Sequence, residues 1–266
     1  MNENQTICWK PVKDSLPQCE KEDYMEDQSA ISRKDCDKTL YPLAYFFGAW
    51  LGDGSFRYNV MTRCYQICFV SADQEIVERF IKDAMSTFYD LKVPYMATEI
   101  TKSGTTIWRV AFCSKLFTEM ICFLTGCKTH LPDFIWDAPK QVQLELLSGL
   151  MDTDGSIIRQ SNAQCRKGYF YLLKFTGTKY FVHQFPDLCR VLGIKLTGYS
   201  VENHSNPKHA QRHLYSISLP SAVANGFKFW CKRKQERLEE SIASAKTRYQ
   251  SVSPETTRLA ALMQKI

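Results

Sequence analysis

The sequence predicts an α/β (α+β) fold built from two pseudo-symmetric copies of an αββαββα unit. Three observations predict it. An apolar stretch that ends in Asp-Gly occurs twice, two further short matches follow it at nearly the same spacing, and strand-like runs alternate with amphipathic helical runs in the same order in both halves. The chain therefore reads as a duplicated unit of about a hundred residues.

The internal matches define the repeat. Shifting the sequence by 101 positions places Asp53-Gly54-Ser55 on Asp154-Gly155-Ser156, with apolar residues filling most of the preceding places. "VERF" at 77–80 then matches "VHQF" at 182–185, and the pattern F-x-x-x-C-K at 123–128 matches 227–232. Three matches in the same order, at shifts of 101, 105 and 104, indicate a duplication.

Each element of the first unit has a counterpart in the second. The first unit is expected to contain helix 41–53, strands 55–60 and 63–71, helix 74–89, strands 95–103 and 105–113, and helix 114–126. The second is expected to contain helix 141–154, strands 156–161 and 169–177, helix 179–193, strands 196–204 and 213–219, and helix 221–232.

The predicted domain boundaries follow from these elements and from composition. Residues 1–40 mix charges of both signs without apolar periodicity and read as a poorly ordered or peripheral extension. The repeats are placed at 41–126 and 141–240, joined by a linker at 127–140 that contains Pro132 and Pro139, and residues 241–266 form a C-terminal tail.

Composition limits the class of protein. With 44% hydrophobic residues among 266, the chain can bury a core, and its apolar stretches fall short of the roughly 18–20 residues that a membrane span requires. The polar N-terminus and eleven cysteines without C-x-x-C spacing argue against a secreted disulfide scaffold. We therefore expect an intracellular protein that does not associate with a membrane, in a compartment that the sequence does not distinguish.

Charge is unevenly distributed. The net charge is +6, but residues 1–40 hold six Lys/Arg against nine Asp/Glu, so the remaining 226 residues carry +9. A basic body suggests a polyanionic partner such as nucleic acid.

Both motif helices end in an aspartate, at the place where the helix dipole disfavours negative charge by roughly 0.3–1 kcal/mol. Small residues, Gly48 and Ala49 in one helix and Ser148 and Gly149 in the other, allow the two helices to pack closely. Packed in the same sense, they would bring two carboxylates together, which is favourable when divalent cations lie between them. The alternative is that both Asp-Gly pairs are plain helix stops in a duplicated structural domain.

The segments "FFGAWLGDG" (46–54) and "LSGLMDTDG" (147–155) resemble the two dodecapeptide (DOD-type) motifs of LAGLIDADG homing endonucleases, in the single-chain, two-repeat form. The resemblance covers about residues 41–240. The first motif departs from the pattern at Leu51, where the family carries its earlier acid; in the second motif Asp152 occupies that non-catalytic position.

The resemblance implies a monomeric, site-specific double-strand DNA endonuclease that acts in intron homing and hydrolyses phosphodiester bonds. It implies Asp53 and Asp154 as catalytic, metal-binding residues, with the carbonyls of Gly52 and Thr153 as further ligands and Mg²⁺ as the metal, for which Mn²⁺ can substitute. Lys128 lies in a region where related enzymes have a lysine near the scissile phosphates, and the internal match makes Lys232 its counterpart.

The resemblance also implies that the strands of each half form an antiparallel, saddle-shaped sheet over a long specific DNA target. Residues of the right chemistry on these strands can pair with base edges in the major groove. The candidates are Arg57, Arg63, Tyr65, Arg109, Arg159, Gln160, Arg166, Tyr199, Arg212 and Tyr215.

A second class of function fits the same scaffold. An RNA maturase that binds intron RNA, or a non-cleaving DNA-binding protein, would have the same repeats. A degenerate binder is expected to lose one motif acid, and both remain here, which favours the enzyme.

Overall fold

The computed structural model describes residues 38–59, 64–88, 90–161, 169–177, 180–202 and 211–249. All but the last three residues of the predicted N-terminal extension lie outside these ranges, as do residues 250–266 of the predicted tail.

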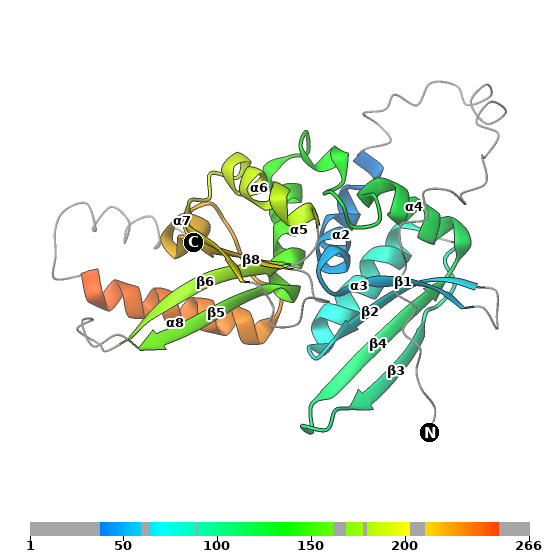
Figure 1. The fold of residues 1–266 in the computed structure, drawn as a ribbon, viewed down its shortest axis with the longest axis horizontal. Coiled ribbons are helices and arrows are strands. Elements are labelled where there is room, and N and C mark those ends of the chain that lie inside the picture. The colour runs from blue at the N-terminus through cyan, green and yellow to red at the C-terminus, as the bar shows by residue number, and fades with distance from the viewer. Residues whose placement is uncertain are drawn as a thin grey trace. The chain divides into compact units, whose positions relative to one another are not determined.

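The first half has the predicted element order (Figure 1). Its elements are η1 (Tyr41–Leu43), α2 (Ala44–Asp53), β1 (Ser55–Asn59), β2 (Cys64–Ser71), α3 (Gln74–Thr87), β3 (Tyr95–Ile100), β4 (Thr106–Cys113) and α4 (Lys115–Thr125).

The second half repeats this order and adds a helix. After the short connection η2 (Asp133–Ile135), its elements are α5 (Lys140–Thr153), β5 (Gly155–Ser161), β6 (Tyr169–Gly177), η3 (Tyr180–Gln184), α6 (Phe185–Val191), β7 (Leu196–Glu202), β8 (Arg212–Ile217), α7 (Leu219–Ala224) and α8 (Lys232–Tyr249).

The two sheets share one topology. The first has the strand order β1-β2-β4-β3 and the second β5-β6-β8-β7, and every pair is antiparallel. Counting strands from the start of each half gives the same order twice. The predicted pseudo-symmetric α/β architecture is therefore confirmed.

Helices cover one face of each sheet, and aromatic stacking shows which face. Phe69 of β2 stacks on Phe80 of α3 with ring centroids 4.4 Å apart, and Phe175 of β6 stacks on Phe185 of α6 at 4.0 Å. Because side chains alternate along a strand, Gln66, Cys68 and Val70 of β2 point to the opposite face. Residues that pair across neighbouring strands lie on the same face of the sheet. The register therefore assigns each partner either to the helix-covered face or to the opposite, open face.

The helices α2 and α5 pack directly against each other at the centre of this part of the molecule. Every residue from Leu43 to Leu51 is buried, which explains why α2 is apolar on all sides rather than amphipathic. A Cβ atom at Gly48 would lie 2.1 Å from the carbonyl oxygen of Leu146, and one at Gly149 would lie 2.3 Å from that of Tyr45. The backbones therefore touch at these two glycines.

Two differences from the sequence prediction lie near the C-terminal end. The predicted helix 221–232 is wrong in its second half, because α7 ends at Ala224 and Gly226 adopts a left-handed φ of +89°. The helix α8 then runs from Lys232 to Tyr249, across the predicted repeat boundary at 240.

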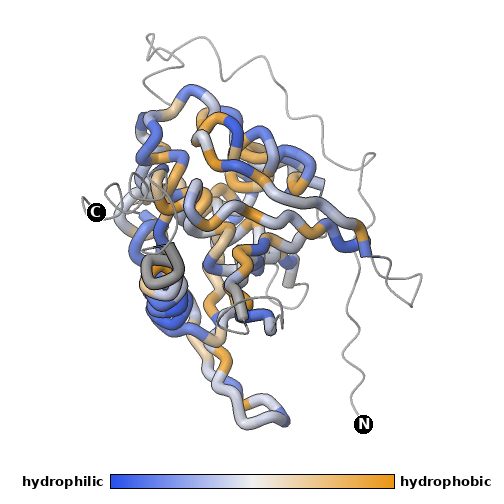
Figure 2. Tube along the Cα trace, turned by 90° about the vertical axis from the view of Figure 1, so that its left-hand side faces the viewer, coloured by the Kyte–Doolittle hydropathy of each residue, from blue (hydrophilic) through white to orange (hydrophobic). Residues whose placement is uncertain are grey.

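The helix α8 is mostly hydrophilic (Figure 2), and its buried face is narrow. Leu238 and Ser241 are buried, and the Tyr171 hydroxyl of β6 donates a 2.6 Å hydrogen bond to Glu240. Tyr171 is in register with Arg159 and lies on the helix-covered face, so α8 contributes to that covering.

Within the described ranges, no helix is long and apolar enough to cross a membrane.

Candidate metal and phosphate site at the paired helix ends

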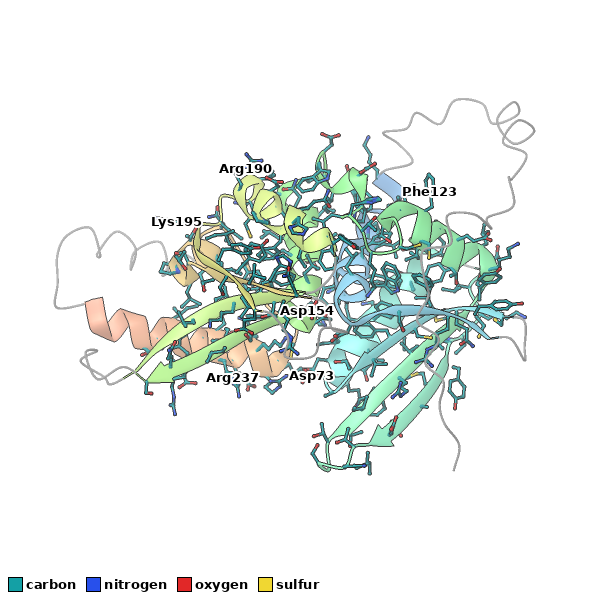
Figure 3. The ribbon with its side chains drawn as sticks, in the orientation of Figure 1. Asp73, Phe123, Asp154, Arg190, Lys195 and Arg237 are labelled. Atoms are coloured by element: carbon teal, nitrogen blue, oxygen red, sulfur yellow. The ribbon has the colours of Figure 1, made fainter. Side chains whose placement is uncertain are left out.

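The two motif helices end side by side. A Cβ atom at Gly52, the residue before Asp53, would lie 2.1 Å from the side-chain oxygen of Thr153 and 3.3 Å from Oδ2 of Asp154. The C-terminal end of α2 thus abuts both the last residue of α5 and the aspartate that follows it (Figure 3). The structure places both predicted aspartates at adjacent helix ends.

Lys128 closes the C-terminal end of α2. Its side-chain Nζ donates hydrogen bonds to the carbonyl oxygens of Leu51 at 3.1 Å and Gly52 at 3.2 Å, and to that of Gly54. The residue is only 7% exposed. A buried ammonium group here satisfies carbonyls that have no partner within the helix and offsets the negative end of the helix dipole.

Lys234 closes the end of α5 in the same way. Its Nζ donates to the carbonyl oxygens of Met151 at 3.0 Å, Asp152 at 2.5 Å, Gly155 at 2.7 Å and Thr153 at 3.4 Å. The 101-residue shift carries the three acceptors of Lys128 onto Asp152, Thr153 and Gly155. Lys234 is therefore the structural counterpart of Lys128.

The predicted pairing of Lys128 with Lys232 is wrong by two residues. Lys232 is exposed at the start of α8, where its backbone N–H donates to Glu75 at 3.1 Å. The sequence "KRK" at 232–234 offers two lysines, and the short F-x-x-x-C-K match selects the first. Burial distinguishes Lys232 from Lys234, because the first turn of α8 directs Lys234 toward α5.

Charge and desolvation compete at Asp53, although the residue is exposed at the end of α2. The surrounding protein raises the pKa of its carboxyl group because it disfavours the charged form, and the ammonium groups of Lys128 and Lys234 act in the opposite direction. Burial lowers the pKa of Lys234, while the carboxylate of Asp152 favours its charged form. Two cations and an aspartate thus lie within electrostatic reach of one another.

Asp152 anchors the segment that brings Lys234 to the site. It is 2% exposed and accepts hydrogen bonds from the Tyr45 hydroxyl at 2.9 Å and from the backbone N–H groups of Trp230 at 3.0 Å and Cys231 at 3.1 Å. Its pKa is raised to about 6, chiefly by burial. In the first motif the corresponding position is Leu51, so only the second helix has this anchor.

The donor atoms suit a hard divalent cation. Carboxylate and carbonyl oxygens are the ligands that such ions take, and Asp53 and Asp154 each provide a carboxylate. The carbonyls of Gly52 and Thr153, the two further predicted ligands, already accept hydrogen bonds from Lys128 and Lys234. A carbonyl oxygen has a second lone pair, so these bonds leave one acceptor position on each.

A groove adjoins the helix ends. Its lining includes Asp53, Thr153 and Lys234, the ion pair of Arg233 with Asp73 (2.9 Å), and Thr105 beside β4. The carboxylates of Asp53, Asp73 and Asp152 also line this groove, which reaches the ends of both motif helices.

The predicted base-reading residues separate by face. On the open faces lie Arg57 and Arg109 in the first sheet and Gln160 and Arg212 in the second. Arg109 also forms a 3.0 Å ion pair with Glu99 of β3. Arg63 and Arg166 lie outside the described residues.

The other four candidates lie on helix-covered faces. Tyr65 and Arg159 pair with Tyr58 and Tyr171 there, and Tyr199 contacts His213 and Tyr215. Tyr215 is 5% exposed and packs against Phe175 and Phe185, so the prediction of a base-facing position is wrong for this residue. Alternation of polar and apolar residues cannot assign the two faces of a strand when aromatic residues occur on both of them.

No family model matches the chain, and no curated protein does. Among solved structures, the chain is similar to mesophilic variants of the homing endonuclease I-DmoI, with a TM-score of 0.48 and 16% identity over 70% of this chain and 93% of that one. It is similar to I-DmoI in complex with DNA and Mn, with a TM-score of 0.47 and 14% identity over 70% and 93%. It is also similar to the meganuclease I-SmaMI bound to uncleavable DNA, with a TM-score of 0.45 and 13% identity over 85% and 96%.

Proposed function

We propose that the protein is a divalent-metal-dependent, site-specific double-strand DNA endonuclease of the LAGLIDADG type. The observation that carries the proposal is the convergence of two aspartate-terminated helices, each closed by a buried lysine that donates to equivalent carbonyls. A plain helix stop needs no aspartate at the negative end of the helix dipole.

In this proposal Asp53 and Asp154 hold the metal ions, and the remaining lone pairs of the Gly52 and Thr153 carbonyls are further ligands. When bound, Mg²⁺ or Mn²⁺ lowers the pKa of a coordinated water and stabilises the leaving oxygen of a phosphodiester. Because both aspartates come from one chain, the site is complete in a monomer.

Lys128 and Lys234 supply the fixed positive charge next to the aspartates. Each ammonium is held by at least three carbonyls, so it is oriented before a substrate arrives. Such preorganised cations stabilise the charge that develops on a phosphate in the transition state. Lys232, on the surface of α8, is in this proposal a candidate for contact with the DNA backbone only.

The open faces of the two sheets are the proposed DNA surface. A two-stranded antiparallel ribbon fits the major groove, and arginine and glutamine pair bidentately with guanine and adenine. Arg57, Arg109, Gln160 and Arg212 are the base-reading candidates that lie on these faces. The Glu99 partner of Arg109 would have to release it first.

The first test is cleavage of a randomised duplex DNA library, sequenced at the cut ends, with Mg²⁺ and with Ca²⁺ in its place. We expect recurrent, Mg²⁺-dependent ends that disappear in Asp154→Asn, while binding of the selected site in Ca²⁺ is largely retained. Asp187→Asn, at an exposed position on α6, is the matched control and should cut normally. Unchanged cutting by Asp154→Asn would exclude the proposed site.

The same experiment separates the alternatives. Retention of a specific duplex without cuts would indicate a non-cleaving DNA-binding protein. Absence of cuts together with retention of structured intron RNA would indicate a maturase.

A further inference from the structure

The C-terminal end of α4 forms a turn that brings two cysteines together. Gly126 adopts φ +50°, and the backbone N–H of Cys127 donates a 2.9 Å hydrogen bond to the carbonyl oxygen of Cys122, five residues earlier. This is the bond that defines a Schellman motif, with Gly126 as the left-handed residue. The motif usually places the side chains of its first and last residues in contact, and here both of them are thiols.

The two cysteines are neighbours at this turn and differ in exposure. Cys122 is half-buried and Cys127 is exposed. The interaction between the two thiols lowers the pKa of Cys127 to about 7 and, together with burial, raises the pKa of Cys122. An exposed thiol with thiolate character next to a second, protonated thiol is the arrangement of a reactive and a resolving cysteine.

The turn leads straight into Lys128. Cys127 and Lys128 have φ values of +56° and +75°, so with Gly126 three successive residues are left-handed. Non-glycine residues in this conformation are strained and persist only where their surroundings hold them. The Lys128 side chain passes within 4.9 Å of the Trp50 ring centroid and ends on the carbonyls of Leu51, Gly52 and Gly54.

We propose that Cys122 and Cys127 form a reversible dithiol–disulfide modification site, oxidised by low-molecular-weight disulfides, that controls the position of Lys128. Closing an S–S bond of about 2.05 Å requires the two sulfurs to move into covalent contact. The displacement acts on the strained turn that immediately precedes Lys128.

The chemistry is thiol–disulfide exchange. The Cys127 thiolate attacks one sulfur of the reagent disulfide, forming a mixed disulfide and releasing one thiolate. Cys122 then loses its proton to solvent and attacks the Cys127 sulfur, forming the internal disulfide and releasing the second thiolate. The two cysteines lose two electrons, and the reagent disulfide gains them.

A second pair of thiols provides an internal comparison. Cys64 and Cys113 lie on neighbouring strands of the first sheet, and the pKa of Cys64 is raised, chiefly by burial. The thiolate form of Cys64 is therefore disfavoured. We expect this pair to react more slowly than the pair at the end of α4.

The test uses the full-length reduced protein, without DNA, treated with glutathione disulfide at neutral pH and mapped by peptide mass spectrometry. We expect the Cys122–Cys127 disulfide to form first, and Cys122→Ser to stop at the mixed disulfide on Cys127. Cys113→Ser, the matched control, should give the same disulfide at the same rate. Preferential modification of any other cysteine, or a stable mixed disulfide in the unmodified protein, would overturn the proposal.

A second measurement follows Lys128 itself. Labelling with an amine-reactive ester should modify Lys128 several-fold faster in the oxidised protein than in the reduced one, with Lys234 unchanged and the difference removed by reductant. Equal labelling of Lys128 in both forms would show that the disulfide does not control this residue. Both measurements are independent of the proposed cleavage activity, so their failure is distinguishable from its failure.

Discussion

Lys128 and Lys234 show how a single side chain can end a helix. Each buried ammonium group donates to carbonyl oxygens at the C-terminal end of a motif helix. An aspartate lies at the same helix end. The lysine offsets the unfavourable placement of the aspartate at the negative end of the helix dipole. The pairing also gives the two residues a shared role in the proposed site.

Substitution of Lys234 should therefore affect both stability and cleavage. In Lys234→Met, buried carbonyls lose their donor, which we expect to lower the free energy of unfolding by about 1–3 kcal/mol. Loss of the fixed charge should reduce the cleavage rate by about 10²-fold. Urea titration and single-turnover cleavage measure the two effects.

The control for this prediction is Lys232→Met. Lys232 is exposed, so its replacement should leave stability within about 0.5 kcal/mol of the unmodified protein and cleavage nearly unchanged. Equal loss of cleavage in the two variants would contradict the assignment of Lys234 as the counterpart of Lys128.

Asp83 on α3 gives a pH-dependent prediction. Its pKa is raised from 3.8 to about 6, mainly by burial, although Arg79 favours the charged form. Between these values the folded state holds the proton more strongly than the unfolded chain does. The free energy of unfolding should consequently fall as pH rises from about 4 to about 6, by up to about 3 kcal/mol from this group.

Asp83→Asn should remove that contribution. Urea titrations at pH 4, 5, 6 and 7 should show a shallower fall in stability between pH 4 and 6 than in the unmodified protein, with Asp187→Asn as an exposed control. The same slope in Asp83→Asn and the unmodified protein would refute the prediction.

At the scale of elements, the pairing of α2 with α5 depends on two glycines. The nearest atoms to an added Cβ at Gly48 are the backbone O of Leu146 at 2.1 Å and the backbone N of Leu150 at 2.8 Å. Backbone atoms of a packed helix cannot rotate aside as a side chain can. The helices would have to separate, and the helix ends with them.

Gly48→Ala should therefore destabilise the protein by about 1–3 kcal/mol or more, and it should weaken metal-dependent cleavage more than it weakens DNA binding. Thermal unfolding and cleavage assays measure this. Gly198→Ala, where the nearest atom to the new Cβ is a side-chain atom of Ser216 at 3.6 Å, should change stability by less than about 0.5 kcal/mol. Similar unfolding temperatures for the two variants would contradict the close packing of the helices.

At the scale of the molecule, Arg79 joins the two repeats. Its guanidinium group bonds Asp83 on its own helix and Glu145 on α5, and it lies 4.7 Å from the ring centroid of Tyr45 and 4.2 Å from that of Trp230. The four partners come from both halves of the duplication. One cation thus links α3 to α5 and to the segment before α8.

Arg79→Ala would leave Asp83, which is 7% exposed, without its cationic partner. We expect a loss of about 3–5 kcal/mol in the free energy of unfolding. Arg190→Ala removes an exposed ion pair with Asp187 and should cost about 0–1 kcal/mol. Comparable losses in the two variants by urea titration would show that Arg79 does not join the repeats.

The sequence by itself determined the duplication, the order of strands and helices as far as α7, and the positions of the two aspartates at the ends of the motif helices. These follow from local signals: apolar residues recur with the period of a helix or a strand, and the 101-residue shift needs no three-dimensional information. It also identified Lys128, although on resemblance rather than on spacing.

Only the tertiary structure decided which lysine is the partner of Lys128, where α8 lies, and which strand residues face outward. Lys234 is the partner of Lys128 because it is buried against α5. The residues next to it in the sequence do not indicate this burial. The apolar face of α8 is narrow and includes Leu238 and Ile242. Its packing beside the second sheet is seen only in the tertiary structure. Tyr215 is buried because Phe175 and Phe185 enclose it. In each case contacts between residues far apart in the chain override the local pattern, because burial depends on the whole fold.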